Sequence, residues 1–255
     1  MEWFWKLDNT ERLQVLSGSA LKVLAMVSMA IDHTASYVLR YTDAAWEPLF
    51  VLGHHNITYY FLMRCVGRLA FPIFAFLIVE GFLHTRNRRK YGRNLLLFAL
   101  ISEIPWNLTH GGHIYGLSQN VFFTLFLGFL ALCVVERWER RMPDDNFAPR
   151  RMAIQLFAII VAGILIRCDY GSSGVSFILL LYVLRHQAIL RAAIGCCFLG
   201  SRWIAGLSFI PIGMYNGKRG FINRAWSKYL FYAFYPLHLL LLYYIQQVVR
   251  GNCPL

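Results

Sequence analysis

The chain consists largely of long apolar runs separated by basic clusters, and this pattern limits its fold more than any other feature. Hydrophobic residues make up 58% of its 255 residues. The runs are roughly 17–22 residues long, which is the length that a helix needs to cross the hydrocarbon core of a bilayer. We therefore predict an all-α fold, a polytopic transmembrane helical bundle with about nine spans (eight to ten).

The predicted spans lie near residues 20–40, 62–84, 94–109, 118–136, 152–168, 174–186, 188–200, 203–215 and 229–249. Those between 174 and 215 are short for a bilayer core of roughly 30 Å, so tilted, broken or re-entrant segments are alternatives there. No linker divides the chain, and we predict one transmembrane domain over residues 20–255. Residues 1–19 have the pattern of an amphipathic helix at the membrane interface, with aromatic anchors at positions 3–5.

Lysine and arginine gather in alternate loops. One set of loops holds the clusters near residues 86–93, 137–151 and 218–228. The other set holds only Arg40, Arg64, Arg167, Arg202 and Arg250. The positive-inside rule makes the first set cytoplasmic, which predicts a cytoplasmic N-terminus and an external C-terminus. Topology thus explains the formal net charge of +12, and we expect no nucleic-acid partner. The cysteines form no CxxC pair, so we expect no metal site.

Polar residues inside the apolar runs mark where chemistry is expected. Ionisable groups are costly in a bilayer and usually face the bundle interior or a water-filled cavity. In the predicted topology most of them lie in the outer half of the membrane, namely Asp32, His33, Arg68, Glu103, Asn107, Asn120, Asp169 and Tyr170. Glu80 is the exception, since it lies near the cytoplasmic end of its span. We expect the outer group to share one cavity.

The first two spans supply His33, Asp32 and Arg68. His33 is a candidate general base, because an unperturbed histidine has a pKa of about 6.5. The alternative is a structural hydrogen bond between helices. Asp32 diverges from His33 by about 100° on a helix, so the two need not touch. Arg68 is either a clamp for a developing oxyanion or a structural ion pair with a buried carboxylate. Pro72 is expected to kink the second span.

Other candidates lie in the third and last spans. Glu103 is a candidate acid or base, since desolvation raises the pKa of a carboxyl group, and a structural pairing role is the alternative. Asn107 follows it, and Pro105 between them is expected to end the regular helix. His238, behind Tyr235 in the last span, either reaches the cavity or satisfies a neighbouring helix. The basic loop is either purely topogenic or also attracts an anionic nucleotide through Arg86, Arg88, Arg89, Lys90 and Arg93.

Several of these stretches resemble the TraX family in order and spacing over roughly residues 20–245. The matching stretches are LKVLAMVSMAIDH, GRLAFPIFAFLIVEGFLHT, FALISEIPWNL, NVFFTLFLG, the Asp169-Tyr170-Gly171 turn and YAFYPLHLLLL. TraX is a conjugative-plasmid inner-membrane protein that N-acetylates pilin. It is similar to integral-membrane acyltransferases that modify surface glycans and carry an intramembrane histidine in the first span. His33 corresponds to that histidine by position, and Arg68 is a counterpart of an arginine in those enzymes.

The resemblance implies an integral-membrane acyltransferase of the bacterial cytoplasmic (inner) membrane. Its donor would be cytoplasmic acetyl-CoA, and its acceptor an amine or hydroxyl of a pilin-like N-terminus, a glycan or a small molecule. The expected catalytic residues are His33, Asp32, Arg68 and Glu103. The expected substrate-binding residues are Asn107, Asn120, Asp169, Tyr170, Tyr235, His238 and Glu80. The acetyl-CoA residues would be Arg86, Arg88, Arg89, Lys90 and Arg93.

Two other functions compete with an acyltransferase. A proton-coupled small-solute transporter would also place Asp, Glu and His residues inside the bilayer as a relay. The missing internal repeat and the one-sided depth of the polar residues speak against it. A non-catalytic assembly subunit is the third candidate, and it would need fewer buried ionisable groups.

Overall fold

A computed structural model describes residues 14–53, 55–142, 144–222 and 227–251. Most of the predicted amphipathic helix of residues 1–19 lies outside these ranges. The chain divides into two compact units. Unit 1 comprises Met1–Leu77 and Ala192–Phe231, and unit 2 comprises Ile78–Arg191 and Tyr232–Leu255. This division reflects the compactness of each unit and does not test whether residues 20–255 form one transmembrane domain, which therefore stays a prediction.

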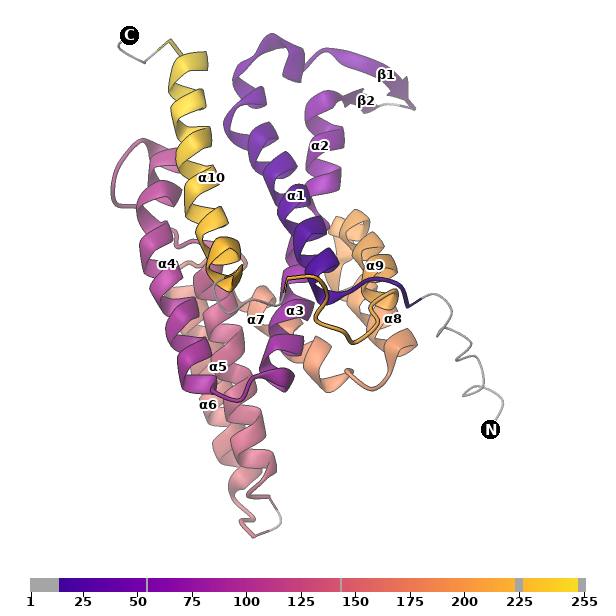
Figure 1. Ribbon diagram of the computed structural model, residues 1–255, viewed down its shortest axis with the longest axis vertical. Coiled ribbons are helices and arrows are strands. Elements are labelled where there is room, and N and C mark those ends of the chain that lie inside the picture. Colours follow the sequence, from indigo (N-terminus) through magenta and orange to yellow (C-terminus); the bar gives the residue numbers. More distant parts are fainter. Residues whose placement is uncertain (1–13, 54, 143, 223–226, 252–255) are drawn as a thin grey trace. The chain divides into compact units, whose positions relative to one another are not determined.

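The elements of unit 1 come from both ends of the chain. They are α1 (Gly18–Tyr37), η3 (Leu39–Tyr41), η4 (Asp43–Ala45), β1 (Pro48–Leu52), β2 (His55–Thr58), α2 (Tyr59–Gly67), the start of α3 (Ala70–His84), most of α8 (Ala188–Leu199), η5 (Gly200–Ser208), α9 (Phe209–Gly213) and the start of α10 (Ser227–Val249). α1 packs along α2 (Figure 1). The Ser17 hydroxyl caps α1 by accepting from the Ala20 N–H at 3.3 Å. The Ser19 hydroxyl donates to the Arg219 carbonyl at 2.7 Å, which ties α1 to the segment after α9.

A short β-hairpin follows α1 where we predicted only a loop. β1 and β2 pair antiparallel, and Gly53 between them has a φ of +62° that favours glycine. All five residues of β1 are exposed. An apolar run, a glycine and a second short run are typical of a hairpin. Residues 48–58 have this pattern, which a search for apolar spans does not detect.

The second predicted span, 62–84, is broken into α2 and α3. The break falls at Arg68 and Leu69, four residues before Pro72. Pro72 has no N–H, and its ring conflicts with the carbonyl of the residue four positions earlier, which is Arg68. The predicted kink is therefore present, and it puts Arg68 at an irregular part of the backbone.

Unit 2 is built around α5. Its elements are the end of α3, α4 (Arg88–Gly111), α5 (Val121–Glu139), α6 (Ala148–Leu165), α7 (Gly171–Val183), the start of α8 and most of α10. α4 and α6 run alongside α5, and α7 packs against both α5 and α6 (Figure 1). Gly128 permits the close approach of α7, because a Cβ there would overlap the side chain of Ile178.

Pro105 does not end the helix as we predicted, since α4 continues to Gly111. The hydroxyl of Thr109 donates to the carbonyls of Pro105 and Trp106 at 3.1 and 2.8 Å. The Trp106 indole in turn donates to the Ser118 carbonyl at 3.0 Å. Proline inside a membrane helix is tolerated where neighbouring groups support the backbone around it, and the Thr109 hydroxyl supports the turn that follows Pro105.

The all-α prediction is confirmed, with the hairpin as an addition. Among the described residues, three helical segments are long and apolar enough to cross a membrane: Tyr59–His84, which comprises α2 and α3, Val121–Glu139 and Ala148–Leu165. Shorter apolar helices are Gly171–Val183, Ala188–Leu199 and Trp203–Gly213. About nine spans are not confirmed by this finding, and that number stays a prediction.

Candidate functional site

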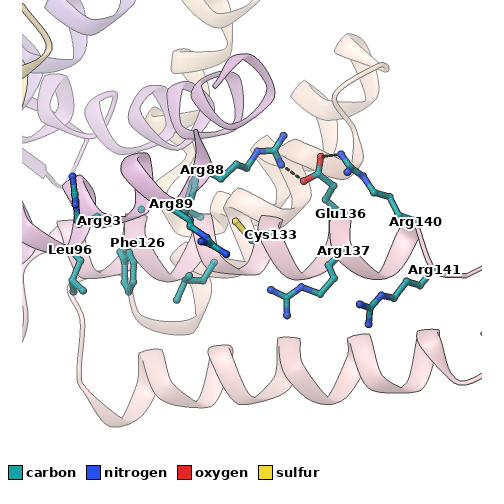
Figure 2. A pocket seen from close by; sticks show the side chains of 13 residues that line it. Arg88, Arg89, Arg93, Leu96, Phe126, Cys133, Glu136, Arg137, Arg140 and Arg141 are labelled. Atoms are coloured by element: carbon teal, nitrogen blue, oxygen red, sulfur yellow. Dashed lines mark hydrogen bonds and ion pairs between the residues drawn. The ribbon is translucent and has the colours of Figure 1, made fainter. Parts of the chain in front are cut away.

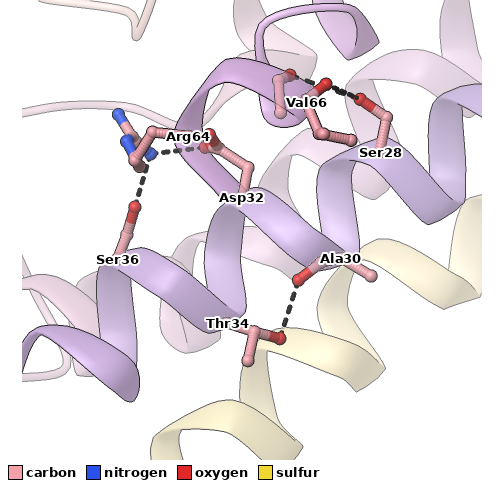
Figure 3. Close-up of polar contacts among 8 residues, drawn as sticks. Ser28, Ala30, Asp32, Thr34, Ser36, Arg64 and Val66 are labelled. Atoms are coloured by element: carbon pink, nitrogen blue, oxygen red, sulfur yellow. Dashed lines mark hydrogen bonds and ion pairs between the residues drawn. The ribbon is translucent and has the colours of Figure 1, made fainter. Parts of the chain in front are cut away.

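A polar seam joins α1 to α2 inside unit 1. Ser28, Asp32 and Ser36 are spaced four residues apart and so lie on one face of α1. The Ser28 hydroxyl donates to the Val66 carbonyl at 2.7 Å. Arg64 Nη1 donates to Asp32 Oδ2 at 2.6 Å and also to the Ser36 hydroxyl (Figure 3). The seam thus holds an ion pair between two helices.

Asp32 is only half satisfied by this arrangement. Its second oxygen, Oδ1, is buried and accepts no hydrogen bond from any described residue. The carboxylate lies against Gly67, where a Cβ would overlap it. Glycine at this position therefore allows α2 to approach Asp32, and Oδ1 keeps lone pairs that can accept from a substrate or a water.

Arg64, not Arg68, is the ion-pair partner of Asp32. Arg68 lies one turn further on, at the end of α2, and acts on Asp32 through the electrostatic field without a direct ion pair among the described residues. Two guanidinium groups thus face one carboxylate in a helical hairpin that lipid is expected to surround. We had counted Arg64 only as a loop charge. Arg64 and Arg68 are four residues apart and so lie on one face of a helix, which could have indicated that Arg64 also faces α1.

His33 is the next residue after Asp32 on α1. It is half-buried, and its ring centroid lies 5.3 Å from that of Tyr37. Successive residues diverge by about 100° on a helix, so His33 and Asp32 present different faces. The predicted catalytic residues of unit 1 are therefore gathered within one helical pair, and their catalytic roles stay predictions.

A second polar cluster ties α4 to the start of α5 in unit 2. Glu103 Oε1 accepts from the Asn120 backbone N–H at 2.9 Å and from the Asn120 side-chain amide. That amide also donates to the Ala99 carbonyl at 2.8 Å. Asn120 Oδ1 accepts from the Phe122 N–H at 3.0 Å and so caps α5. These bonds give the Glu103 carboxylate a structural role in joining α4 to α5. Its predicted catalytic role stays a prediction.

The loop between α4 and α5 completes this cluster. The Asn107 side chain forms a hydrogen bond with the Glu103 side chain, and its amide donates to the Ile114 carbonyl at 3.2 Å. The Asp169 N–H donates to the Gln119 carbonyl at 2.9 Å. Thus Glu103, Asn107, Asn120 and the backbone of Asp169 meet at one end of unit 2, as the predicted topology requires. The Tyr170 N–H joins them through a 3.4 Å bond to the Thr124 hydroxyl.

The remaining predicted residues of unit 2 lie elsewhere. The His238 ring nitrogen bonds the Phe234 carbonyl at 2.8 Å. Tyr235 is buried and packs edge-on against Phe122 at 5.3 Å between ring centroids. Glu80 lies 3.7 Å from the ring of His84. One cavity shared by all the predicted residues stays a prediction, because it joins residues of both units.

Unit 2 also contains an open groove of about 760 Å³ at the basic ends of α4 and α5 (Figure 2). It is lined by Arg88, Arg89, Gly92, Arg93, Leu96, Phe126, Phe129, Leu130, Cys133, Glu136, Arg137, Arg140 and Arg141. Glu136 pairs with Arg88 and, at 2.9 Å, with Arg140. Of the predicted cofactor residues, Arg86 and Lys90 are not among the lining residues. The arginines of α5 were not predicted, although they lie in the next basic cluster of the same predicted side.

No group of three or more His, Cys, Asp or Glu residues in the described ranges is arranged to hold a metal ion. The groove and the two polar clusters all bear on a ligand or a reaction.

These features define a helical membrane protein with ionisable groups inside its helices. Residues 17–246 match the family model of the TraX protein, and the chain belongs to the TraX family. It is 32% identical over 255 aligned residues to the "Probable fimbrial assembly protein FimC, serogroup H1" of Dichelobacter nodosus, with 89% of this chain and 94% of that protein covered. No solved structure matches the chain.

Proposed function

We propose that this TraX-family protein is an integral-membrane acyltransferase that transfers an acetyl group from cytoplasmic acetyl-CoA to an amine or hydroxyl acceptor. The observation that supports it most is the seam of unit 1. Arg64 neutralises Asp32, which leaves Arg68 without an ion pair among the described residues, in the same pair of helices as His33. A surplus cation at bilayer depth requires an anionic partner, and a developing oxyanion is one.

The proposed reaction uses this chain's own residues as follows. His33 accepts the proton of the acceptor amine or hydroxyl as the acceptor attacks the thioester carbonyl. Arg68 stabilises the tetrahedral oxyanion. The carbon–sulfur bond then breaks, the new carbon–nitrogen or carbon–oxygen bond remains, and the CoA thiolate receives the proton from His33. Asp32 and Arg64 hold α1 against α2 while this happens.

The membrane and the acceptor are part of the proposal. We place the protein in a bacterial cytoplasmic (inner) membrane as a multi-pass protein with its N-terminus in the cytoplasm and its C-terminus outside. Acetyl-CoA then arrives from the cytoplasm and the acceptor from outside. The Dichelobacter relative is named as a probable fimbrial assembly protein, which favours a pilin-like protein N-terminus over a glycan or a small molecule.

The test is acetyl transfer by the purified full-length protein in nanodiscs, followed by mass spectrometry of CoA and of the acceptor. His33→Ala should bind CoA within about twofold of wild type but lose about 10²-fold or more in turnover, the usual weight of a general base. His113→Ala is the matched control, because His113 is exposed in the loop after α4 and should leave turnover unchanged.

Two outcomes would contradict the proposal. One is normal turnover in His33→Ala. The other is a wild-type protein that neither binds CoA nor transfers acetyl groups but supports proton-coupled solute uptake in liposomes, which would identify the transporter instead.

A further inference from the structure

The groove at the basic ends of α4 and α5 has two walls that the sequence keeps far apart. α4 contributes Arg88, Arg89 and Arg93, and the end of α5 together with the turn after it contributes Arg137, Arg140 and Arg141 (Figure 2). Six arginines therefore surround one acidic residue, Glu136. Such an excess of guanidinium groups attracts a ligand with several negative charges.

Glu136 already neutralises part of this charge. It binds Arg88 from one wall and Arg140 from the other, and so bridges the groove. The Arg88 guanidinium also stacks 3.8 Å above the ring of Phe82. No ion pair within the described residues involves Arg89, Arg93 or Arg137. These three guanidinium groups are thus available to an anion, and Glu136 competes with it for Arg88 and Arg140.

The floor of the groove is apolar. Leu96 comes from α4, and Phe126, Phe129 and Leu130 come from α5. Pockets of about 300–1,000 Å³ that combine an apolar lining with a few charged groups suit ligands of nucleotide size. A ligand with phosphates at one end and an uncharged arm at the other matches both parts of this groove. Arginine is the residue that binds phosphate with two parallel hydrogen bonds.

We propose that this groove binds the phosphate-bearing part of a nucleotide thioester, with Arg137, Arg140 and Arg141 as the second wall of the site and Glu136 as the counter-ion that the phosphates displace. The inference rests on the proposed function, whose donor is such a thioester. It adds the α5 residues and makes Glu136 a determinant of affinity. A nucleotide with several phosphates fits six arginines better than a lipid phosphodiester, which brings a single negative charge.

The test measures binding of coenzyme A to the full-length protein in nanodiscs of a zwitterionic lipid at several salt concentrations. Arg89→Gln combined with Arg137→Gln should raise the Kd at least about tenfold, because charge-assisted hydrogen bonds from both walls are lost. It should also flatten the salt dependence. Arg150→Gln removes one positive charge from exposed α6, outside the groove, and should change the Kd less than about twofold; Arg137→Gln alone is the single-charge variant to compare with it.

Glu136→Gln supplies the sharper half of the test. It should lower the Kd for coenzyme A by about threefold or more, because the competing carboxylate is gone. Glu139→Gln removes the same charge one turn away on α5, at an exposed position outside the groove, and should leave the Kd unchanged. Thermal unfolding of each variant checks that it remains folded.

The outcomes separate this inference from the proposed function. Wild-type coenzyme A binding that is unaffected by the groove substitutions overturns the groove and leaves acetyl transfer standing. Groove-dependent binding by a protein that transfers no acetyl group supports the groove and overturns the proposed reaction. Binding of phosphatidylglycerol that depends on the groove arginines, by a wild-type protein that binds no coenzyme A in zwitterionic nanodiscs, would show a lipid site and overturn the inference.

Discussion

At the scale of single residues, the contact with Asp32 distinguishes the two arginines of the second span, Arg64 and Arg68. Arg64 contacts Asp32 and Ser36 directly, whereas Arg68 reaches Asp32 only through its field. The side chains of the pair are 27% and 19% exposed, so most of each charge is removed from solvent. The two arginines should therefore respond differently to substitution, one in stability and the other in turnover.

We predict that Arg64→Gln destabilises the protein by about 1–3 kcal/mol, because it leaves the Asp32 carboxylate buried without its partner. The partial exposure of the pair places the value below that of a fully buried ion pair. Asp32→Asn in the same chain should recover part of the loss. Arg68→Lys should leave the unfolding temperature unchanged while turnover falls, since an ammonium group cannot replace the planar guanidinium. Equal losses of stability for Arg64→Gln and Arg68→Lys would contradict this assignment.

The sequence revealed that Asp32, His33 and Arg68 are unusual but not which of them touch. Their depth followed from hydropathy, whereas the Asp32–Arg64 pair depends on how closely α1 and α2 approach. Gly67 sets that approach, and a lone glycine beside a polar residue carries no sequence signal of its contact. The partner of a buried charge is thus a property of packing that the order of residues does not specify.

At the scale of elements, the α4–α5 turn shows a candidate acid or base in a structural setting. Glu103 fixes Asn120 while Asn120 caps α5, so one carboxylate links two helices. Glutamine has the same shape and keeps an oxygen that accepts hydrogen bonds. Substitution by glutamine therefore separates the geometry of this residue from its charge.

We predict that Glu103→Gln keeps the fold, whereas Asn120→Ala lowers the stability by about 1–2 kcal/mol through loss of the cap. Thermal unfolding and acetyl transfer measured on the same preparations check both statements. A folded Glu103→Gln protein with turnover reduced by about 10²-fold would assign acid–base catalysis to this carboxylate.

The positions of several helices were predictable because the length of each apolar run can be read directly from the sequence. α5 spans Val121–Glu139 where we predicted 118–136, and α10 spans Ser227–Val249 where we predicted 229–249. The hairpin of residues 48–58 and the continuation of α4 through Pro105 were not predicted. Both depend on local hydrogen bonds and side-chain contacts, which hydropathy does not report.

At the scale of the whole molecule, the layout along unit 2 agrees with the charge pattern of the loops. The arginines near residue 88 and those near residue 137 meet in one groove, and Asn120 meets Asp169 at the other end of α5. These pairs were assigned to the same sides of the membrane from sequence alone. α4 connects the two ends, and its 24 residues extend about 36 Å, enough for a bilayer core of about 30 Å.

The orientation of this layout gives the last prediction. Lys90 and Tyr115 are both exposed, and they lie near opposite ends of α4. If the groove faces the cytoplasm, Lys90→Cys should resist a membrane-impermeant maleimide in intact cells, whereas Tyr115→Cys should react. Lys90 does not line the groove, so this substitution leaves the proposed site intact.

Labelling is counted above the background of the native cysteines, and permeabilised cells serve as the control in which both variants should react. Labelling of Lys90→Cys and protection of Tyr115→Cys in intact cells would reverse the orientation and place the arginine groove outside. A donor from the cytoplasm could then not reach the groove, because a polyanionic nucleotide does not cross the hydrocarbon core. The same experiment therefore tests the charge rule, the side of the groove and the route of the proposed donor.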